Sequence, residues 1–102
     1  MFIEVEKVNA HGVSGKDKIL CQVARSQDEG ANVYRPTFQV PSEGFLTPAG
    51  EGVFAVRAEI EARSEGSKNI VARILSADGK TKAASIRLHR AFLKEAVPAN
   101  ES

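Results

Sequence analysis

The sequence predicts an all-β domain: a small five-stranded antiparallel barrel with Greek-key connections, extended at its C-terminal end by a strand or a short helix. Short stretches in which apolar and polar residues alternate indicate strands that bury one face. Clusters of Gly, Pro, Asn and Asp separate these stretches, and no segment could supply the long helix that connects parallel strands. At 102 residues the chain suits a single core, so we expect one barrel domain over residues 1–94 and a mobile polar tail over 95–102.

The first forty residues predict three strands. Residues 1–8 (MFIEVEKV) alternate, residues 19–26 (ILCQVARS) are rich in apolar and β-branched residues, and residues 33–40 (VYRPTFQV) combine both features. The segments between them are rich in Gly, Ser and Asn and indicate exposed turns. Because Pro36 has no N–H group for a sheet hydrogen bond, we expect the third strand at a sheet edge or with a bulge.

A loop and a long fourth strand follow. Residues 41–52 hold two Pro and three Gly, which is typical of a loop. Residues 53–63 then alternate, and because successive side chains of a strand point to opposite faces, one face is apolar. Phe54, Val56 and Ile60 lie on that apolar face, so we expect all three in the core.

The opposite face of this fourth strand is charged, since it carries Arg57, Glu59, Glu61 and Arg63. Opposite charges on one sheet face stabilise each other, so a self-neutralising face is the first interpretation. A plain solvated face is typical of antiparallel sheets and is a second one. If the protein binds a polyanion, the two arginines would instead serve its phosphates.

The last third of the domain predicts one more strand and a segment with two open assignments. Residues 68–75 predict the fifth strand, and Asp78–Gly79 favours a hairpin turn after it. Within residues 80–94, alternation indicates a strand to about residue 89, while Ala, Leu, Lys and Glu favour a helical turn from Arg90. The alternating residues are Ala84, Ile86 and Leu88.

Charge is distributed unevenly along the chain, although the net charge is only +1. Residues 1–67 contain 7 Lys and Arg against 10 Asp and Glu, a net charge of −3, whereas residues 68–94 contain 7 cations against Asp78 alone, a net charge of +6. This asymmetry indicates either an anionic partner or pairing between the two halves across a sheet.

The residues expected of an active site or a metal site do not occur in a recognisable pattern. His11 and His89 are the only histidines, they lie far apart in the sequence, and Cys21 has no second cysteine. Cys21 lies in an apolar run, where a buried and inert thiol is expected. We therefore expect no enzyme, no metal, no cofactor and no small-molecule substrate.

Nothing in the sequence predicts export or membrane insertion. No apolar run approaches the roughly 20 residues that cross a bilayer. The first residues, MFIEVEKV, do not have the basic and apolar regions of a signal peptide. A single cysteine excludes an internal disulfide, so we expect a cytoplasmic protein.

Binding of single-stranded nucleic acid without sequence preference requires cations for the phosphates and exposed aromatic rings for the bases. The chain has one Tyr, five Phe and no Trp. Tyr34, beside Arg35, is the best stacking candidate, but it shares a predicted strand face with Phe38 and Val40, which fits a half-buried structural role equally well. Phe45 in the loop either contacts a ligand or caps one end of the barrel.

Three stretches together resemble the single-stranded DNA-binding proteins of filamentous bacteriophages. They are HGVSGKDK (11–18), similar to a basic loop of that family, VYRPTFQVPSEGFLTPAGEGVFAV (33–56), with its Pro-Ala-Gly turn between strands, and RAEIEARSEGSKNIVARILSADG (57–79), similar to the closing strands. Two features depart from the family: aliphatic residues follow the basic loop where an aromatic is usual, and the basic segment 80–94 extends beyond the family's core.

The resemblance implies an OB-type barrel, a two-fold homodimer and cooperative coating of single-stranded DNA during replication. Lys16 and Lys18 match the basic loop, Tyr34 and Arg35 match the region of aromatic and basic DNA contacts, and Arg57 lies on the outer face of the strand after the Pro-Ala-Gly turn. Together with cations elsewhere in the chain, the predicted DNA-binding residues are Lys16, Lys18, Arg25, Tyr34, Arg35, Arg57, Lys68 and Arg73.

We therefore expect a sequence-tolerant single-stranded DNA-binding protein that acts by phosphate neutralisation and limited base stacking, with RNA as an open alternative to DNA. The competing hypothesis is a small β-rich structural or interaction protein, either virion-associated or an inhibitor, that binds no nucleic acid. A steep salt dependence of binding separates the two, because neutralised phosphates release counterions.

Overall fold

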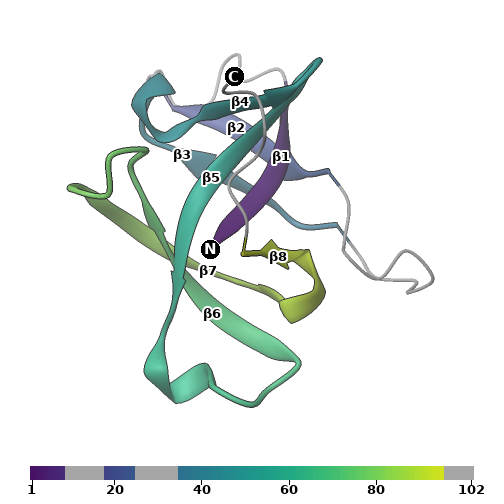
Figure 1. Ribbon diagram of the computed structural model, residues 1–102, viewed down its shortest axis with the longest axis vertical. Coiled ribbons are helices and arrows are strands. Elements are labelled where there is room, and N and C mark those ends of the chain that lie inside the picture. The colour runs from purple at the N-terminus through teal and green to yellow at the C-terminus, as the bar shows by residue number, and fades with distance from the viewer. Residues whose placement is uncertain (9–17, 25–34, 96–102) are drawn as a thin grey trace.

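The alternating stretches of the sequence form one antiparallel sheet that curls into a nearly closed barrel (Figure 1). The computed structural model describes residues 1–8, 18–24 and 35–95. Within these residues there is no α-helix, and three short 3-10 turns interrupt the strands. The predicted all-β antiparallel barrel is therefore confirmed, although the sheet has eight strands where the sequence indicated five or six.

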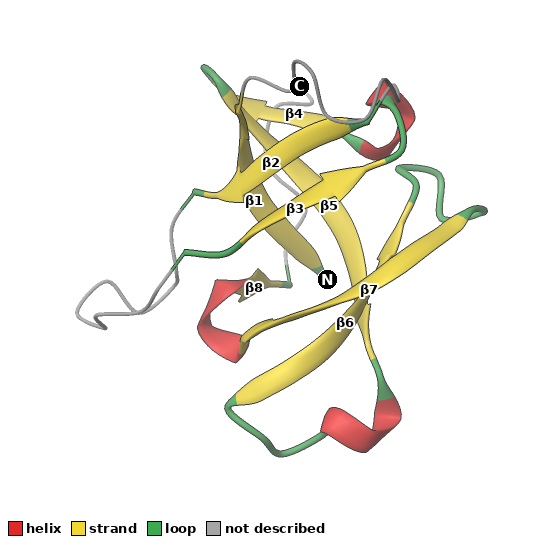
Figure 2. Ribbon diagram, turned by 180° about the vertical axis from the view of Figure 1, so that it is seen from behind, coloured by secondary structure: helices red, strands yellow, loops and turns green. Residues whose placement is uncertain are grey.

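The hydrogen-bonded path through the sheet runs β3-β2-β1-β5-β6-β7, while β4 pairs with β5 and β8 pairs with β1. Figure 2 shows β2 and β3 in the upper part of the barrel and β6 and β7 in the lower part. The strands are β1 (Phe2–Val8), β2 (Ile19–Val23), β3 (Thr37–Val40), β4 (Thr47–Gly50), β5 (Val53–Ile60), β6 (Asn69–Leu75), β7 (Lys82–His89) and β8 (Leu93–Lys94).

The two ends of this path, β3 and β7, are connected through the segments that follow β3 and β6. The 3-10 turn η1 (Glu43–Phe45) comes shortly after β3. The backbone N–H of Ala77, in the loop after β6, donates to the carbonyl of Gly44 in η1 at 3.0 Å. One backbone hydrogen bond thus ties the β6–β7 hairpin to the opposite side of the barrel.

The core is made by the inward-facing residues of β1, β2, β3, β5 and β6, with further buried residues from η1, β7, η3 and β8. Alternation places Ile3 and Val5 of β1 inside, as predicted, and both are fully buried. Cys21 is buried as well, and this burial raises the pKa of its thiol to about 11, while Lys7 lowers it and Glu43 raises it through charge. The residues at most 1% exposed in the core cluster are Ile3, Val5, Cys21, Val23, Val40, Val56, Ile70, Ala72, Ile74 and Phe92.

The third strand lies at an end of the hydrogen-bonded path, as Pro36 predicted. The carbonyl of Pro36 accepts from the N–H of Val23 at 3.0 Å, so Pro36 joins the sheet as an acceptor only. The strand itself begins at Thr37, four residues later than expected. Phe38 and Val40 are buried on one face, whereas Tyr34 lies outside the described residues.

The prediction of a loop over residues 41–52 was wrong in part. This segment contains η1 and the short strand β4, which pairs with β5. Its Pro and Gly content masked the strand, because Pro48 cannot donate to a neighbour and is tolerated only where one edge of the strand is unpaired. Phe45 is 5% exposed and belongs to the core cluster, so its ring packs inside the protein and is not free to contact a ligand.

The fourth predicted strand is shorter than its alternation suggested. β5 ends at Ile60, and the 3-10 turn η2 (Ala62–Ser64) follows. The hydroxyl of Ser64 accepts from the N–H of Val71 at 2.9 Å, which fixes this turn against β6. Val56 is fully buried as expected, while Phe54 is only half-buried and packs against the edge of the core.

The predicted hairpin after β6 is confirmed, with a connecting loop over residues 76–81. Asp78 Oδ1 accepts from the hydroxyl of Ser76 at 2.6 Å and from the N–H of Lys80 at 2.9 Å. These two hydrogen bonds hold the pKa of the Asp78 carboxyl below its ordinary value, and the one from Ser76 has the larger effect. Gly79 has φ +78°, a left-handed conformation that other residues rarely adopt.

The segment 80–94 contains both of the elements that the sequence left open. β7 ends at His89, the 3-10 turn η3 (Arg90–Phe92) follows, and β8 pairs with β1. His89 caps the turn, since its Nδ1 accepts from the N–H of Ala91 at 3.0 Å. Of the three alternating residues, Leu88 is buried and Ile86 half-buried, whereas Ala84 is exposed beside the register shift between β6 and β7.

Candidate functional site

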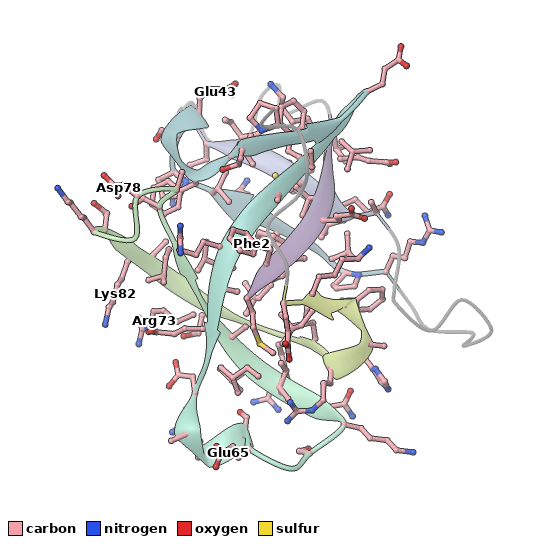
Figure 3. The ribbon with its side chains drawn as sticks, in the orientation of Figure 1. Phe2, Glu43, Glu65, Arg73, Asp78 and Lys82 are labelled. Atoms are coloured by element: carbon pink, nitrogen blue, oxygen red, sulfur yellow. The ribbon has the colours of Figure 1, made fainter. Side chains whose placement is uncertain are left out.

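The basic part of the sequence lies on the β6–β7 hairpin, with its neighbours η3 and β8. Strand register places Arg73 of β6 opposite Ser85 of β7, and Val71 opposite Arg87. Val71 and Arg73 alternate with buried residues of β6, so they face outward, and their partners on β7 face the same way. We call the outward side of β5, β6 and β7 the outer face. Arg73 and Lys82 project from the hairpin to the same side of the molecule (Figure 3).

Among the residues that the structure describes, three of the seven cations in residues 68–94 form ion pairs with carboxylates from the acidic first part of the chain. The pairs are Arg73 Nη2 with Glu61 Oε2 at 3.6 Å, Lys82 Nζ with Glu59 Oε1 at 3.8 Å, and Lys94 Nζ with Glu4 Oε1 at 3.2 Å. Pairing between the two halves across the sheet, one of the two explanations for the charge asymmetry, therefore does occur.

The self-neutralising face predicted for residues 53–63 exists, but with other partners. Glu59 and Glu61 were expected to pair with the flanking Arg57 and Arg63 of their own segment. They pair instead with cations on β6 and β7, because the neighbouring strands place those cations on the same outer face. No carboxylate partner of Arg63 occurs among the described residues.

Three cations of the hairpin region remain exposed, and within the described part of the chain they have no carboxylate partner. They are Lys68 before β6, Lys80 in the hairpin loop and Arg87 on β7. β6 has seven residues, so Lys68 and Lys80 lie at opposite ends of a strand about 20 Å long. Positive charge thus extends along the whole hairpin.

Arg90 adds a cation at the Lys68 end of the hairpin. Its backbone N–H donates to the carbonyl of Lys68 at 2.6 Å. Its guanidinium donates to the carbonyls of Ser67 at 3.0 Å and Ser64 at 3.4 Å. Because these acceptors are neutral carbonyls, the contacts fix the turn without neutralising the positive charge of Arg90.

Arg57, a predicted DNA-binding residue, makes contacts inside the protein. Its Nε and Nη2 donate to the carbonyl of Ala77 at 3.2 and 3.1 Å, and its guanidinium lies 5.3 Å from the centre of the Phe2 ring. The side chain is half-buried beneath the hairpin loop, where a Cβ on Gly79 would be 3.8 Å from Arg57 Cδ. Arg57 therefore joins β5, β1 and the hairpin.

Two further predicted residues, Lys18 and Arg35, are exposed but lie at opposite ends of the β2–β3 pair. Lys18 precedes Ile19, which pairs with Val40 at the end of β3, whereas Arg35 precedes the start of β3. Of the other predicted residues, Arg73 lies on β6 and Lys68 immediately precedes that strand, whereas Lys18 and Arg35 are apart from each other. The remaining predicted residues, Lys16, Arg25 and Tyr34, lie outside the described residues.

Aromatic rings for base stacking are scarce among the described residues. Phe2, Phe38, Phe45 and Phe92 are all at most 8% exposed. Phe54 is half-buried, and Lys7 Nζ lies 4.8 Å from the centre of its ring. In the described part of the chain the outer face therefore offers cations and hydroxyl groups, and stacking is left to Tyr34.

The prediction of the site omitted Lys80, Lys82, Ser85 and Arg87. The signal for the three cations was present in the charge asymmetry, but a segment with two open assignments could not be given an outward face. Ser85 carries no charge, so only the register opposite Arg73 identifies it.

The described residues contain no group of three or more His, Cys, Asp or Glu side chains that could hold a metal ion. Within the same residues, no helix has the length and apolar character needed to cross a membrane. No family model, no curated protein and no solved structure matches this chain.

Proposed function

We propose that the protein binds single-stranded DNA without sequence preference and coats single strands during phage-type DNA replication, in the cytoplasm and as a homodimer. The observation that carries this proposal is the exposed positive charge of the β6–β7 hairpin. Lys68, Lys80 and Arg87 have no carboxylate partner among the described residues, so their charge is available to an anionic ligand. The proposal assigns no catalytic step and no cofactor to the chain.

Phosphate contacts dominate the proposed binding mode. Each phosphate that a Lys or Arg neutralises releases condensed counterions, which gives affinity without reading the base sequence. Base stacking makes a smaller contribution, because four of the described phenylalanines are buried and Tyr34 is the stacking candidate. RNA offers the same phosphates, so preference for DNA requires its own measurement.

A second function is favoured by one specific observation. Three cations of the basic segment are neutralised by carboxylates of the same chain, and ion pairs of this kind also occur in proteins that bind no polyanion. On this alternative the protein is a small structural or interaction protein, virion-associated or an inhibitor, and its outer face is solvated.

A fluorescence titration with labelled oligo-dT at two salt concentrations distinguishes the two functions. The proposed function predicts binding at low salt and a log–log salt dependence whose slope is about −0.7 for each phosphate contacted. Labelled oligo-rU in the same titration measures the preference between DNA and RNA. If oligo-dT does not bind at low salt, the structural alternative is favoured.

A further inference from the structure

On the outer face, one oxygen of the Glu61 carboxylate accepts a hydrogen bond and also forms an ion pair. Glu61 Oε2 accepts from the hydroxyl of Ser85 at 2.7 Å, and Arg73 Nη2 lies 3.6 Å from the same oxygen. Strand register explains this convergence, because Arg73 lies opposite Ser85 and Glu61 follows the end of β5. A hydroxyl donor and a guanidinium donor thus meet at a single anionic oxygen.

A second carboxylate lies beside the first on the same face. Glu59, which is opposite Arg73 in the β5–β6 pair, places its Oε1 3.8 Å from Lys82 Nζ. Arg73 is oriented toward this region by its Nη1, which donates to the carbonyl of Ala83 at 3.3 Å. The outer face therefore holds a guanidinium, an ammonium and a hydroxyl, each in contact with a carboxylate of β5 or of the residue that follows it.

The three donor groups are those that proteins use to bind phosphate. Arg, Lys and Ser side chains supply a large share of the contacts to phosphate oxygens in nucleic-acid complexes, and guanidinium groups suit oxyanions in particular. A carboxylate offers these donors the same kind of charged oxygen. In the free protein, Glu59 and Glu61 thus occupy the positions in which phosphate oxygens would be bound.

The two carboxylates are held differently. The Lys82 and Glu59 side chains are 61% and 53% exposed, so solvent screens their pair and little free energy opposes its separation. The Glu61 side chain is only 25% exposed and also accepts from Ser85, so it is held more firmly. A phosphate would therefore displace Glu59 more readily than Glu61.

We propose that the outer face holds two adjacent phosphate-binding positions, one made by Arg73 with Ser85 and one by Lys82, which Glu61 and Glu59 respectively occupy in the absence of nucleic acid. This inference rests on the proposed function and names how the same site is regulated. The carboxylates compete with the phosphates, so they lower the affinity of the protein for single strands and limit binding to ligands with several adjacent phosphates.

The test compares the double variant Glu59→Gln, Glu61→Gln with the wild-type chain in oligo-dT titrations at two salt concentrations. Glutamine keeps the size of each side chain and removes its charge. We expect affinity at low salt to rise on the order of tenfold, and the log–log slope to become steeper by about 1.4, which corresponds to two additional phosphates. The control is Glu51→Gln with Glu65→Gln, which removes the same charge from exposed residues that are not in an ion pair with a described residue.

Two further variants show whether the gain acts through the named cations. Adding Lys82→Gln to the double variant should cancel about half of the increase in slope, since one phosphate contact is lost. Glu59→Gln alone serves if the double variant melts at a lower temperature, because Glu59 is exposed and its loss leaves Ser85 and Arg73 in place. This single variant should steepen the slope by about 0.7.

The outcomes separate this inference from the proposed function. If the wild type binds oligo-dT and the double variant behaves like its control, the competition is refuted while the proposed function stands. If the wild type does not bind and the double variant does, the phosphate-binding positions are supported and coating by the wild-type chain is refuted. Absence of binding in both chains overturns both.

Discussion

Two regions of the barrel place cations on outward positions: β1 with its neighbours β5 and β8, and the β6–β7 hairpin. The two regions use these cations differently. Around β1, Arg57 of β5 donates to a carbonyl and lies over Phe2, and Lys94 of β8 pairs with Glu4, so each charge is used inside the protein. On the hairpin, Arg87 is exposed and has no carboxylate partner among the described residues. An outward position in a strand therefore does not by itself identify a ligand contact.

Burial by neighbouring segments accounts for this difference. The loop over residues 76–81 folds over β5 and supplies the carbonyl of Ala77 to Arg57. Nothing in the described part of the chain covers Arg87 in the same way, because β7 is at the end of the hydrogen-bonded path. The comparison predicts that substitutions in the first region affect stability and those in the second affect binding.

The largest expected effect is on stability, from Arg57→Ala. This change removes two hydrogen bonds from a charged donor and leaves the carbonyl of Ala77 without its partner, which costs about 1.5–3 kcal/mol. Loss of the contact with Phe2 adds about 0.5–1 kcal/mol. Urea denaturation should therefore show a free energy of unfolding lower by about 2–4 kcal/mol.

Arg87→Ala is the matched control for Arg57→Ala. It removes the same side chain from an exposed position, so the free energy of unfolding should change by no more than about 0.5 kcal/mol. Equal losses of stability in the two variants would contradict the distinction between the two regions.

The next largest effect is on binding, from the triple variant Lys68→Gln, Lys80→Gln, Arg87→Gln. If these cations contact phosphates, affinity for oligo-dT at low salt should fall on the order of tenfold or more, and the slope should become shallower by about 0.7 per lost contact. Lys7→Gln is the control, because Lys7 already pairs with Glu43 at 3.1 Å. A triple variant with the wild-type slope would remove the hairpin from the proposed interface.

A smaller effect is expected from Gly79→Ala, in the loop that connects the two regions. At φ +78° an added Cβ strains the backbone, and the cost is about 1–2 kcal/mol. Gly44→Ala is a suitable comparison, since its added Cβ would lie 3.5 Å from Ser42 Oγ, in ordinary contact, and its φ is not in the left-handed region. Thermal melting of the two variants should show the larger decrease for Gly79→Ala, and the reverse order would exclude loop strain as the cause.

The smallest expected effect depends on pH and comes from Asp78→Asn. The pKa of Asp78 is lowered by the Ser76 hydroxyl and the Lys80 N–H, so the ionised carboxylate stabilises the folded state. This stabilisation is present above the ordinary pKa of 3.8 and is lost as the pH falls through the lower folded value. Melting curves from pH 7 to pH 2 should show a wild-type advantage that disappears in acid. An advantage independent of pH would assign it to the shape of the loop.

Alternation predicted the strands whose two faces differ in burial. Ile3 and Val5 of β1 alternate with charged residues, so this strand could be located from the sequence. β6 was located by its apolar and β-branched content, since among the residues between its buried positions only Arg73 is charged. β4 was missed because Pro48 and Gly50 have low strand propensity, and its pairing with β5 depends on a neighbour rather than on its own residues.

Prediction of the candidate site was limited by contacts between segments that are distant in the sequence. The role of Arg57 depends on a carbonyl twenty residues further along the chain. The pairing of Glu61 depends on Arg73 and Ser85 of two other strands. The charge of the segment 68–94 was visible in the sequence, whereas the partners that neutralise part of it required the register.

The register shift between β6 and β7 has a consequence for which side Lys82 faces. Two steps along β6, from Arg73 to Leu75, are matched by three steps along β7, from Ser85 to Lys82. Without the extra residue, Ala83 would lie opposite Leu75 and the ammonium of Lys82 would turn toward the interior. The geometry of this surface therefore depends on a local mismatch in strand length, so a one-codon insertion or deletion there could reorganise it while every charged residue is retained.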